Sequence, residues 1–140
     1  NLLPEIGKNA ALLMIKPDNF KEINDGFGHE AGDQVLNLMA IFLHSELREN
    51  DIGIRFRGDE YAAILIDTDR VNAAKTAEGL RSSFRNMDLS GITGPAGISI
   101  RISIGIAMYP DDTDNSTDLV KIAHEKMMTA RSQGGDKIIP

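Results

Sequence analysis

The chain has 140 residues, of which 41% are hydrophobic and 26% charged, and its formal net charge is −6. A chain of this length buries enough surface for one ordinary globular domain and needs no metal or disulfide to hold it together. The absence of cysteine excludes disulfides and thiolate metal sites, and the acidic balance argues against a general affinity for DNA or RNA backbones.

The apolar stretches are short, and residues 10–15 are typical of them. A membrane span needs roughly 18 apolar residues, so we expect no membrane insertion by this segment. The sequence shows no signal peptide, and it begins at Asn1 without a methionine. We therefore expect a single domain over residues 1–140 that belongs to a longer protein, with other domains of that protein as its partners.

The first elements are indicated by an apolar run and by helical spacing. Residues 10–15 (AALLMI) form a continuous apolar run that is typical of a central strand. Pro17 ends this strand, and Asp18 is placed to cap a short helix behind it. Apolar residues at helical spacing then predict the longest helix over residues 30–48.

A hairpin is expected next. Residues 52–56 alternate apolar side chains with glycine and arginine, and residues 61–66 form a second strand-like run. Gly58 and Asp59 lie between the two runs and are a dipeptide that favours tight turns. The two strands are therefore predicted to pair antiparallel, with the RGDE segment at the tip.

The second half of the chain predicts a helix over residues 70–85, a loop over 90–97, a strand over 98–106, a helix over 117–132 and a closing strand at 138–139. Together with the first half this gives five strands and four helices. The expected fold class is α/β (α+β), a mixed or antiparallel sheet flanked on each side by a layer of helices.

Two groups of polar residues could carry chemistry. Asp59 and Glu60 lie together at the hairpin tip, where a pair of carboxylates could hold magnesium or take a proton. A solvated acidic turn is the alternative. Asn24 and Asp33 carry acceptors that could read the donor edge of a guanine, although helix and turn formation explains them equally well.

Five segments, taken together, resemble a known family. FKEIND, GHEAGD, RGDEY, SIGIA and the alanine- and methionine-containing segment of residues 123–131 come in the order and spacing of a GGDEF (diguanylate cyclase) domain, over nearly the whole chain. The resemblance implies a fold similar to the nucleotidyl-cyclase palm, with a ferredoxin-like core. It also implies a bacterial, cytoplasmic signalling domain whose active relatives join two GTP molecules into cyclic di-GMP across a homodimer.

The resemblance assigns roles to individual residues. Asp59 is the third letter of the signature, where two Mg²⁺ ions lie between it and a carboxylate ending the first strand. Glu60 is the fourth letter, which is linked to metal binding or to deprotonation of the attacking hydroxyl, and Lys21 belongs to the same motif. Asn24, Asp33 and Arg131 match nucleotide-binding positions: the first two recognise guanine, and the third stands for a phosphate-binding lysine.

The sequence also departs from the family pattern. Lys16 stands where the first metal-binding aspartate is expected, and an ammonium cannot ligate magnesium. Arg57 replaces the first signature glycine, His124 replaces a usual aspartate, and Gly135 replaces a phosphate-binding arginine. We therefore expect weak or absent Mg²⁺ binding and impaired catalysis, with Lys16 forming an ion pair with Asp59.

An Arg-x-x-Asp motif precedes the signature by the interval seen in many members, where it forms an allosteric site for cyclic di-GMP. Here the motif consists of Arg48 and Asp51. Arginine can grip a phosphate or a guanine edge while aspartate accepts from the base. A helix-ending arginine followed by a turn aspartate is the alternative. A supporting basic residue of the family matches Gly79, with Arg81 close by.

The resulting hypothesis is a catalytically impaired domain that binds cyclic di-GMP through Arg48 and Asp51 and regulates attached domains. An active diguanylate cyclase, in which Asp18 replaces the missing metal ligand, is one alternative. A second is a GTP-binding regulator of an adjoining phosphodiesterase domain, and a third is a dimerisation module that binds no nucleotide.

Overall fold

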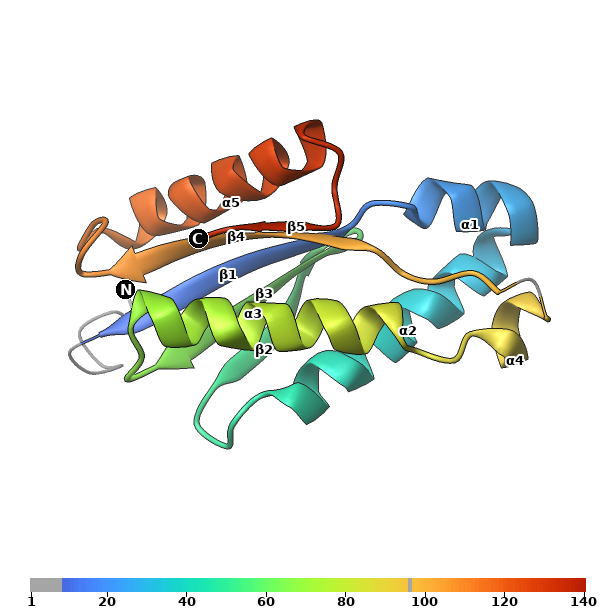
Figure 1. Ribbon diagram of the computed structural model, residues 1–140, viewed down its shortest axis with the longest axis horizontal. Helices are drawn as coiled ribbons and strands as arrows, with labels where there is room; N and C mark the ends of the chain where they lie inside the picture. Colours follow the sequence, from blue (N-terminus) through green and yellow to red (C-terminus); the bar gives the residue numbers. More distant parts are fainter. Residues whose placement is uncertain (1–8, 96) are drawn as a thin grey trace.

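The computed structural model describes residues 9–95 and 97–140, which form one five-stranded sheet covered by helices (Figure 1). The strand order is β2-β3-β1-β4-β5. The strands are β1 (Ala10–Pro17), β2 (Ile52–Arg57), β3 (Glu60–Ile66), β4 (Ile102–Tyr109) and β5 (Lys137–Ile139). The helices are α1 (Phe20–Phe27), α2 (His29–Glu46), α3 (Arg70–Arg85), α4 (Ser90–Thr93) and α5 (Ser116–Ser132).

Strand β1 lies at the centre of the sheet because its side chains are apolar on both faces. It pairs antiparallel with β3 on one side and with β4 on the other. Strands β2 and β3 form the predicted antiparallel hairpin, whereas β5 pairs parallel with β4. The sheet is therefore mixed, and the central run of residues 10–15 is almost completely buried.

The two faces of the sheet are covered by different helices (Figure 1). Helix α5 packs on one face over β4, β1 and β5. Helices α2 and α3 pack on the opposite face, and α1 continues from the end of β1 onto α2. The expected layer of helices on each side of a five-stranded sheet is confirmed.

Alternating side chains of β1 enter two separate cores. Leu13 and Ile15 belong to the larger cluster beneath α2 and α3, and Leu12 and Met14 belong to the smaller cluster beneath α5. This division follows from the period of two in a strand, which sends successive side chains to opposite faces.

Several boundaries differ from the sequence-based expectations. The longest helix begins at His29 and ends at Glu46, so Arg48 lies outside it. The segment 90–97, predicted as a loop, contains the four-residue helix α4. Strand β4 begins at Ile102 rather than at residue 98 and continues to Tyr109. Periodicity alone misplaced this start because Ile100 is fully buried without pairing in the sheet.

The predicted capping role of Asp18 is also wrong. Asn19 is the residue that precedes α1, and its side chain makes no capping hydrogen bond to the helix. Instead, the Asn19 side-chain amide donates to the Ser99 carbonyl and its oxygen accepts from the Arg101 backbone. Asp18 is turned toward β4 and the start of β5, because partners distant in sequence outcompete the local cap.

Candidate functional site

A cavity of about 380 Å³ lies where β1, α1, the β2–β3 hairpin and α5 meet. Its lining brings together most residues that the sequence singled out, namely Lys16, Lys21, Asn24, Asp59 and Arg131. Asp33 is not among the lining residues and lies exposed on α2. Glu60, the first residue of β3, is not among the lining residues, although it follows Asp59, which is one of them.

Lys16 forms the ion pair that was expected from the sequence. Its Nζ lies 3.1 Å from Oδ1 of Asp59 and 3.5 Å from Oε2 of Glu60. The side chains of Lys16 and Asp59 are only about one-fifth exposed, so water screens the pair weakly. A lysine at the end of the central strand therefore neutralises part of the charge of the signature carboxylates.

Two further side chains reach Glu60. Arg57 donates from Nε to Oε1 of Glu60 at 3.3 Å, and His124 Nε2 lies 3.2 Å from the same oxygen. Arg57 also lies over the Phe56 ring, 5.2 Å from its centroid. Burial alone would raise the pKa of Glu60, but the Arg57 hydrogen bond and the His124 and Lys16 contacts hold this pKa below its ordinary value.

The three nitrogen-bearing side chains come from separate elements, Lys16 from β1, Arg57 from β2 and His124 from α5. Each occupies a position where the sequence departs from the family pattern. Their convergence on Asp59 and Glu60 was not predicted beyond the Lys16–Asp59 pair. Residues 57 and 124 are far apart in the chain, so their spacing carried no signal that the two side chains meet at Glu60.

Asp18 is enclosed by partners of its own. Its Oδ1 accepts from the Ser103 hydroxyl and its Oδ2 from the Asp136 backbone N–H, both at 2.7 Å. Arg131 Nε lies 3.7 Å from Oδ1. Burial raises the pKa of Asp18 in spite of the Ser103 hydrogen bond and the nearby arginines. A Cβ at Gly135 would lie 2.7 Å from this carboxyl group, so a glycine there permits the close approach.

Asn24 lines the cavity, and its side-chain oxygen is turned toward Gly32 of α2. Its Oδ1 is buried and makes no hydrogen bond with the described part of the chain. The side chain lies directly over Gly32, where any Cβ would collide with it. A buried acceptor without a partner is costly, and a ligand that donates an N–H at this point would remove the cost.

Arg48 and Asp51 form a separate site at the opposite end of β3. The two oxygens of Asp51 accept from Nε and Nη2 of Arg48 at 3.0 and 3.1 Å, and also from the backbone of Arg48 and Ile66. Burial opposes ionisation of Asp51, but these hydrogen bonds lower its pKa from the ordinary value. The Asp51 side chain is 3% exposed, whereas that of Arg48 is 61% exposed.

The Arg48 site is lined by residues 48–51 with Ile66 and Asp67, and its cavity measures about 250 Å³. The length of β3 separates it from the signature carboxylates by roughly 20 Å. Arg81, near the position of the expected supporting arginine, is committed elsewhere. It binds Glu78 on its own helix and Asp136 at the start of β5.

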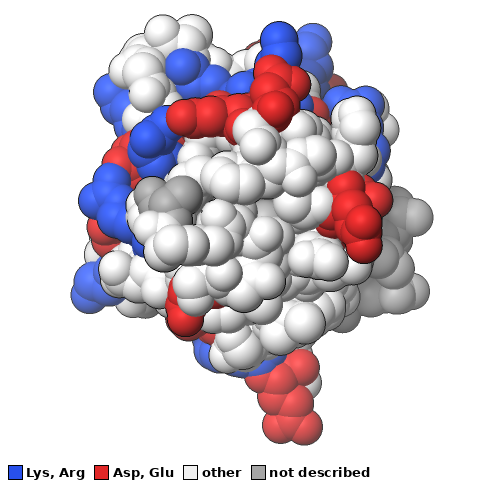
Figure 2. All heavy atoms as spheres, turned by 90° about the vertical axis from the view of Figure 1, so that its right-hand side faces the viewer, with Lys and Arg blue, Asp and Glu red and all other residues white. Residues whose placement is uncertain are grey.

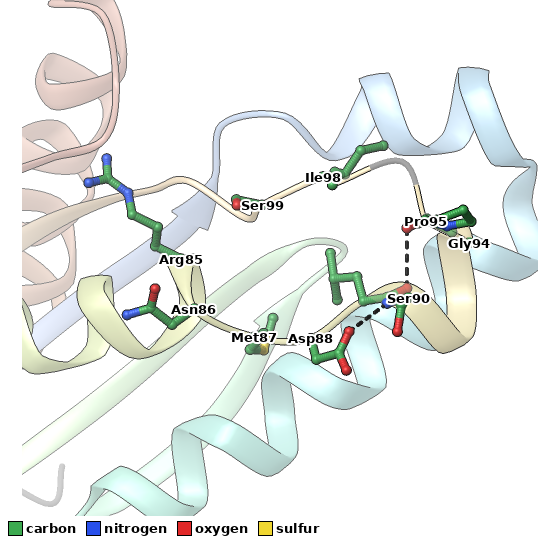
Figure 3. Close-up of a pocket in the computed structure, with 12 residues that line it drawn as sticks. Arg85, Asn86, Met87, Asp88, Ser90, Gly94, Pro95, Ile98 and Ser99 are labelled. Atoms are coloured by element: carbon green, nitrogen blue, oxygen red, sulfur yellow. Dashed lines mark hydrogen bonds between the residues drawn. The ribbon is translucent and has the colours of Figure 1, made fainter.

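A third cavity, of about 400 Å³, lies between the end of α3, α4 and the segment leading to β4 (Figure 3). Its charged side chains have local partners, since Asp88 accepts from the Ser90 backbone and Arg85 pairs with Asp136. Figure 3 shows the Arg85 and Asn86 side chains directed away from Ser90 and Pro95. This end of the molecule is largely uncharged, with acidic and basic side chains around its rim (Figure 2). We assign no site there.

Comparison with known proteins places the chain in one family. The family model described as "Diguanylate cyclase, GGDEF domain" matches residues 3–137, and the chain belongs to this family. The chain is 32% identical over 132 residues to diguanylate cyclase DosC of Escherichia coli, covering 94% of this chain and 28% of DosC.

Solved structures show the same architecture. The GGDEF domain of TpbB (YfiN) from Pseudomonas aeruginosa is 34% identical, with a TM-score of 0.86, and the match covers 96% of this chain and 83% of that one. The GGDEF domain of DgcB from Caulobacter crescentus, solved in complex with c-di-GMP, is 24% identical with a TM-score of 0.83. That match covers 96% of this chain and 78% of the DgcB domain, and it shows the shared fold.

The chain spans about a third of the length of the curated relatives that it matches. Among the described residues, none of the helices has both the length and the apolar character needed to cross a membrane. The family match identifies the chain as a GGDEF domain in cyclic di-GMP signalling. It differs from the family pattern at residues around the signature.

Proposed function

We propose that this domain is a catalytically impaired member of the family that acts as a regulatory or receptor module. The observation that carries the proposal is the placement of Lys16, Arg57 and His124 on the carboxylates of Asp59 and Glu60. These two carboxylates are the ones that a GGDEF domain would use to hold Mg²⁺. In this chain they are already bound by cationic or polar nitrogen groups.

The residues at the signature fit Mg²⁺ poorly. Magnesium requires oxygen ligands in near-octahedral geometry at about 2.1 Å. An ammonium 3.1 Å from Asp59 Oδ1 occupies this region and repels a divalent cation. Asp18 could supply a replacement carboxylate only by giving up its hydrogen bonds with Ser103 and the Asp136 backbone. Metal binding is therefore weak, and the two-metal reaction is not supported.

A direct assay of GTP turnover tests the impairment. We expect the purified protein, incubated with GTP and Mg²⁺, to form no cyclic di-GMP above the level of a Glu60→Gln variant. Glu60 is the appropriate comparison because it occupies the fourth signature position. Robust formation of cyclic di-GMP by the wild-type protein alone would instead establish the active-cyclase alternative and overturn the proposal.

Cyclic di-GMP is proposed to bind at Arg48 and Asp51. Asp51 fixes the Arg48 guanidinium through two hydrogen bonds, while most of the arginine side chain faces solvent. Nη2 of Arg48 also donates to the Ile66 carbonyl, so Nη1 is the guanidinium nitrogen without a partner among the described residues and can donate to a phosphate oxygen or to an acceptor on the edge of a guanine. In this arrangement Asp51 orients Arg48, and Arg48 contacts the ligand.

Calorimetric titration of cyclic di-GMP tests this role. We expect binding by the wild-type protein and at least a tenfold loss of affinity in Arg48→Ala, since a charged hydrogen-bonding partner is removed. Arg101→Ala is a matched control, because the Arg101 side chain is also about half exposed and its ion-pair partner, Glu22, lies 3.9 Å away. Unchanged affinity in Arg48→Ala, or no binding by the wild type, would disprove the assignment.

GTP binding at the cavity lined by Lys16, Asn24 and Asp59 is a second candidate, favoured by the buried Asn24 oxygen, which has no partner in the described part of the chain. The ring N–H and amino groups of guanine are donors that could satisfy it, whereas adenine lacks a matching pattern. We expect GTP to bind more tightly than ATP without added Mg²⁺, and Asn24→Ala to abolish this preference. Equal affinity for GTP and ATP would exclude specific GTP binding at this cavity.

A further inference from the structure

The edge strand β2 carries an exposed apolar face. Ile52 and Ile54 are 40% and 46% exposed, and Phe56, which follows them, is 37% exposed. The residues that pair with them across the hairpin show on which side of the sheet this face lies. Ile52 lies opposite Ile64 and Ile54 opposite Ala62, and both of these partners belong to the core beneath α5.

Helix α5 packs over β4, β1 and β5 (Figure 1) and meets the C-terminal end of β2 at Arg57, whose Nη2 lies 3.4 Å from His124 Nε2. Ile52 and Ile54 therefore extend the apolar surface of the α5 side to the margin of the sheet without a cover of their own. On the other face of β2, Gly53 is buried beneath Leu43 of α2 and Leu47, the residue that follows α2. Only the α5-side face of β2 is open.

The backbone edge of β2 is open as well. Strand β2 is the last strand of the sheet, and among the described residues it pairs with β3 alone. Edge strands are usually protected by lysine, proline, a bulge or short length. Strand β5 at the opposite edge has only three residues, whereas β2 has six and contains neither lysine nor proline.

The protective features that β2 does have lie at its C-terminal end. The pairing with β3 shifts between Arg55 and Arg57, which leaves the Ile52–Arg55 stretch in regular register. Both arginines fold back onto the hairpin tip, Arg55 donating to the Gly58 carbonyl and Arg57 to Glu60. Neither side chain is therefore used to block the edge near Ile54.

From these observations we propose that β2 pairs antiparallel with β2 of a second copy of this chain, joining two sheets into one. The strand is complementary to itself in one register. With Ile54 on a twofold axis perpendicular to the sheet, Ile54 lies opposite its own copy. Arg55 of each chain then lies opposite Gly53 of the other, so that its charge does not face a like charge.

The neighbouring registers are less favourable. A shift that places Arg55 on the axis sets two guanidinium groups directly opposite each other, and like charges in that position destabilise a sheet. A shift that places Gly53 on the axis pairs two glycines and loses the contact between the two Ile54 side chains. The sequence of β2 thus selects the register centred on Ile54.

The dimer is expected to be weak. Two six-residue strands bury less surface than the roughly 1,600 Å² of a standard interface, so association depends on high protein concentration. This surface lies apart from the cavity at the end of β1, but it begins directly after Asp51 of the Arg48 site. The inference does not rest on the proposed function, because it is argued from residues 52–57 alone and its variants leave Arg48 and Asp51 unchanged.

The absence of cysteine allows a clean cross-linking experiment. Residues directly opposite in an antiparallel pair have Cβ atoms about 5 Å apart, close enough for a disulfide with a small adjustment. We expect Ile54→Cys to form a covalent dimer under mild oxidation. Ile41→Cys is the control, because Ile41 is an isoleucine of α2 that is 63% exposed. Equal cross-linking of the two variants, or none by Ile54→Cys, overturns the proposal.

Sedimentation of the protein without cross-links provides the second measurement. We expect the average mass of the wild type to rise with concentration, and Ile54→Lys to remain monomeric because two ammonium groups would meet at the axis. Ile41→Lys should associate like the wild type. Both isoleucines are exposed, so neither change threatens folding. Three results would contradict the proposal: a monomeric wild type, a dimeric Ile54→Lys, or loss of association in both variants.

Discussion

Glu60 is bound by three side chains from three separate elements, and this cluster is the chemical centre of the domain. Lys16, Arg57 and His124 surround the signature carboxylates at 3.1 to 3.5 Å. Each contact alone resembles an ordinary ion pair of modest strength. Together they place positive charge and hydrogen-bond donors where a GGDEF domain would bind a metal.

Restoring the metal site tests this conclusion at the scale of single residues. Replacing Lys16 by aspartate and Arg57 by glycine removes both permanent cations and supplies a carboxylate at the end of β1. We expect millimolar Mg²⁺ to raise the melting temperature of the Lys16→Asp/Arg57→Gly variant by roughly 4 °C if the ion exceeds its dissociation constant about tenfold. The wild type should show no such shift.

A charge control accompanies that experiment. Lys75 lies exposed on α3, away from the cavity, so Lys75→Asp changes the net charge as Lys16→Asp does without adding a ligand to the site. Its melting temperature should not respond to Mg²⁺. An equal response in the wild type would show that Lys16 and Arg57 do not exclude the ion.

The contact between β4 and α5 illustrates how one residue decides the packing of two elements. Gly105 lies in β4 directly beneath α5, and a Cβ at this position would collide with the Ala123 carbonyl and the Met127 backbone nitrogen. Backbone atoms of a helix cannot move aside as a flexible side chain can. The helix therefore approaches the sheet closely only because residue 105 has no side chain.

Two glycine-to-alanine substitutions should consequently act in opposite directions. Gly105→Ala is expected to lower the free energy of unfolding by about 3 kcal/mol, because α5 must shift away from the sheet. Gly79→Ala adds a Cβ in the middle of α3, where nothing lies within 4 Å. It should raise the free energy by about 0.5 to 1 kcal/mol through helix propensity. Denaturant titration of both variants measures the difference, and equal effects would contradict the packing argument.

The stability of the whole molecule depends on carboxylates that are held ionised. Burial opposes the ionisation of Asp51, Glu60 and Asp112. Hydrogen bonds and nearby cations nevertheless lower the pKa of each of these carboxyl groups in the folded protein. A lowered pKa stabilises the fold above the unfolded-state pKa, and this contribution is lost as the pH falls through the folded-state value. Asp18, with its raised pKa, acts in the opposite direction.

We therefore expect the free energy of unfolding to change little as the pH is lowered from 7 to about 5, and then to fall below about pH 4.5. Asp51→Asn should lower stability at neutral pH and make the acid limb less steep. Asp33→Asn, on the exposed surface of α2, is the control and should preserve the wild-type profile. Chemical denaturation over a series of pH values gives these curves. An acid limb that is the same in Asp51→Asn would refute the role of Asp51.

Much of the fold was predictable from local patterns. The apolar run of residues 10–15, the Gly58–Asp59 turn and the helical spacing over residues 70–85 all identified their elements correctly. Local pattern suffices in these cases because strand alternation, turn conformation and helical periodicity are short-range properties. It failed at residues 98–101, which are not part of a strand although Ile100 is fully buried.

The site could be predicted only in part. Motif positions identified Lys16 and Asp59 as partners, since the family resemblance already placed both at one metal site. The contacts of Arg57 and His124 with Glu60, and those of Asp18 with the Asp136 backbone, depend on segments that are distant in the chain. Only the packed sheet brings these segments together.

The amino-acid sequence by itself therefore determined the order of the elements, the family, and the loss of a carboxylate at residue 16. The tertiary structure decided where the substituted side chains point. It also decided that the Asn24 side-chain oxygen has no partner among the described residues, and that β2 is an open edge of the sheet. The physical reason is the separation along the chain of the residues that interact. Backbone conformation responds mainly to near neighbours, whereas charge pairing and burial are set by whichever surfaces the folded chain brings into contact.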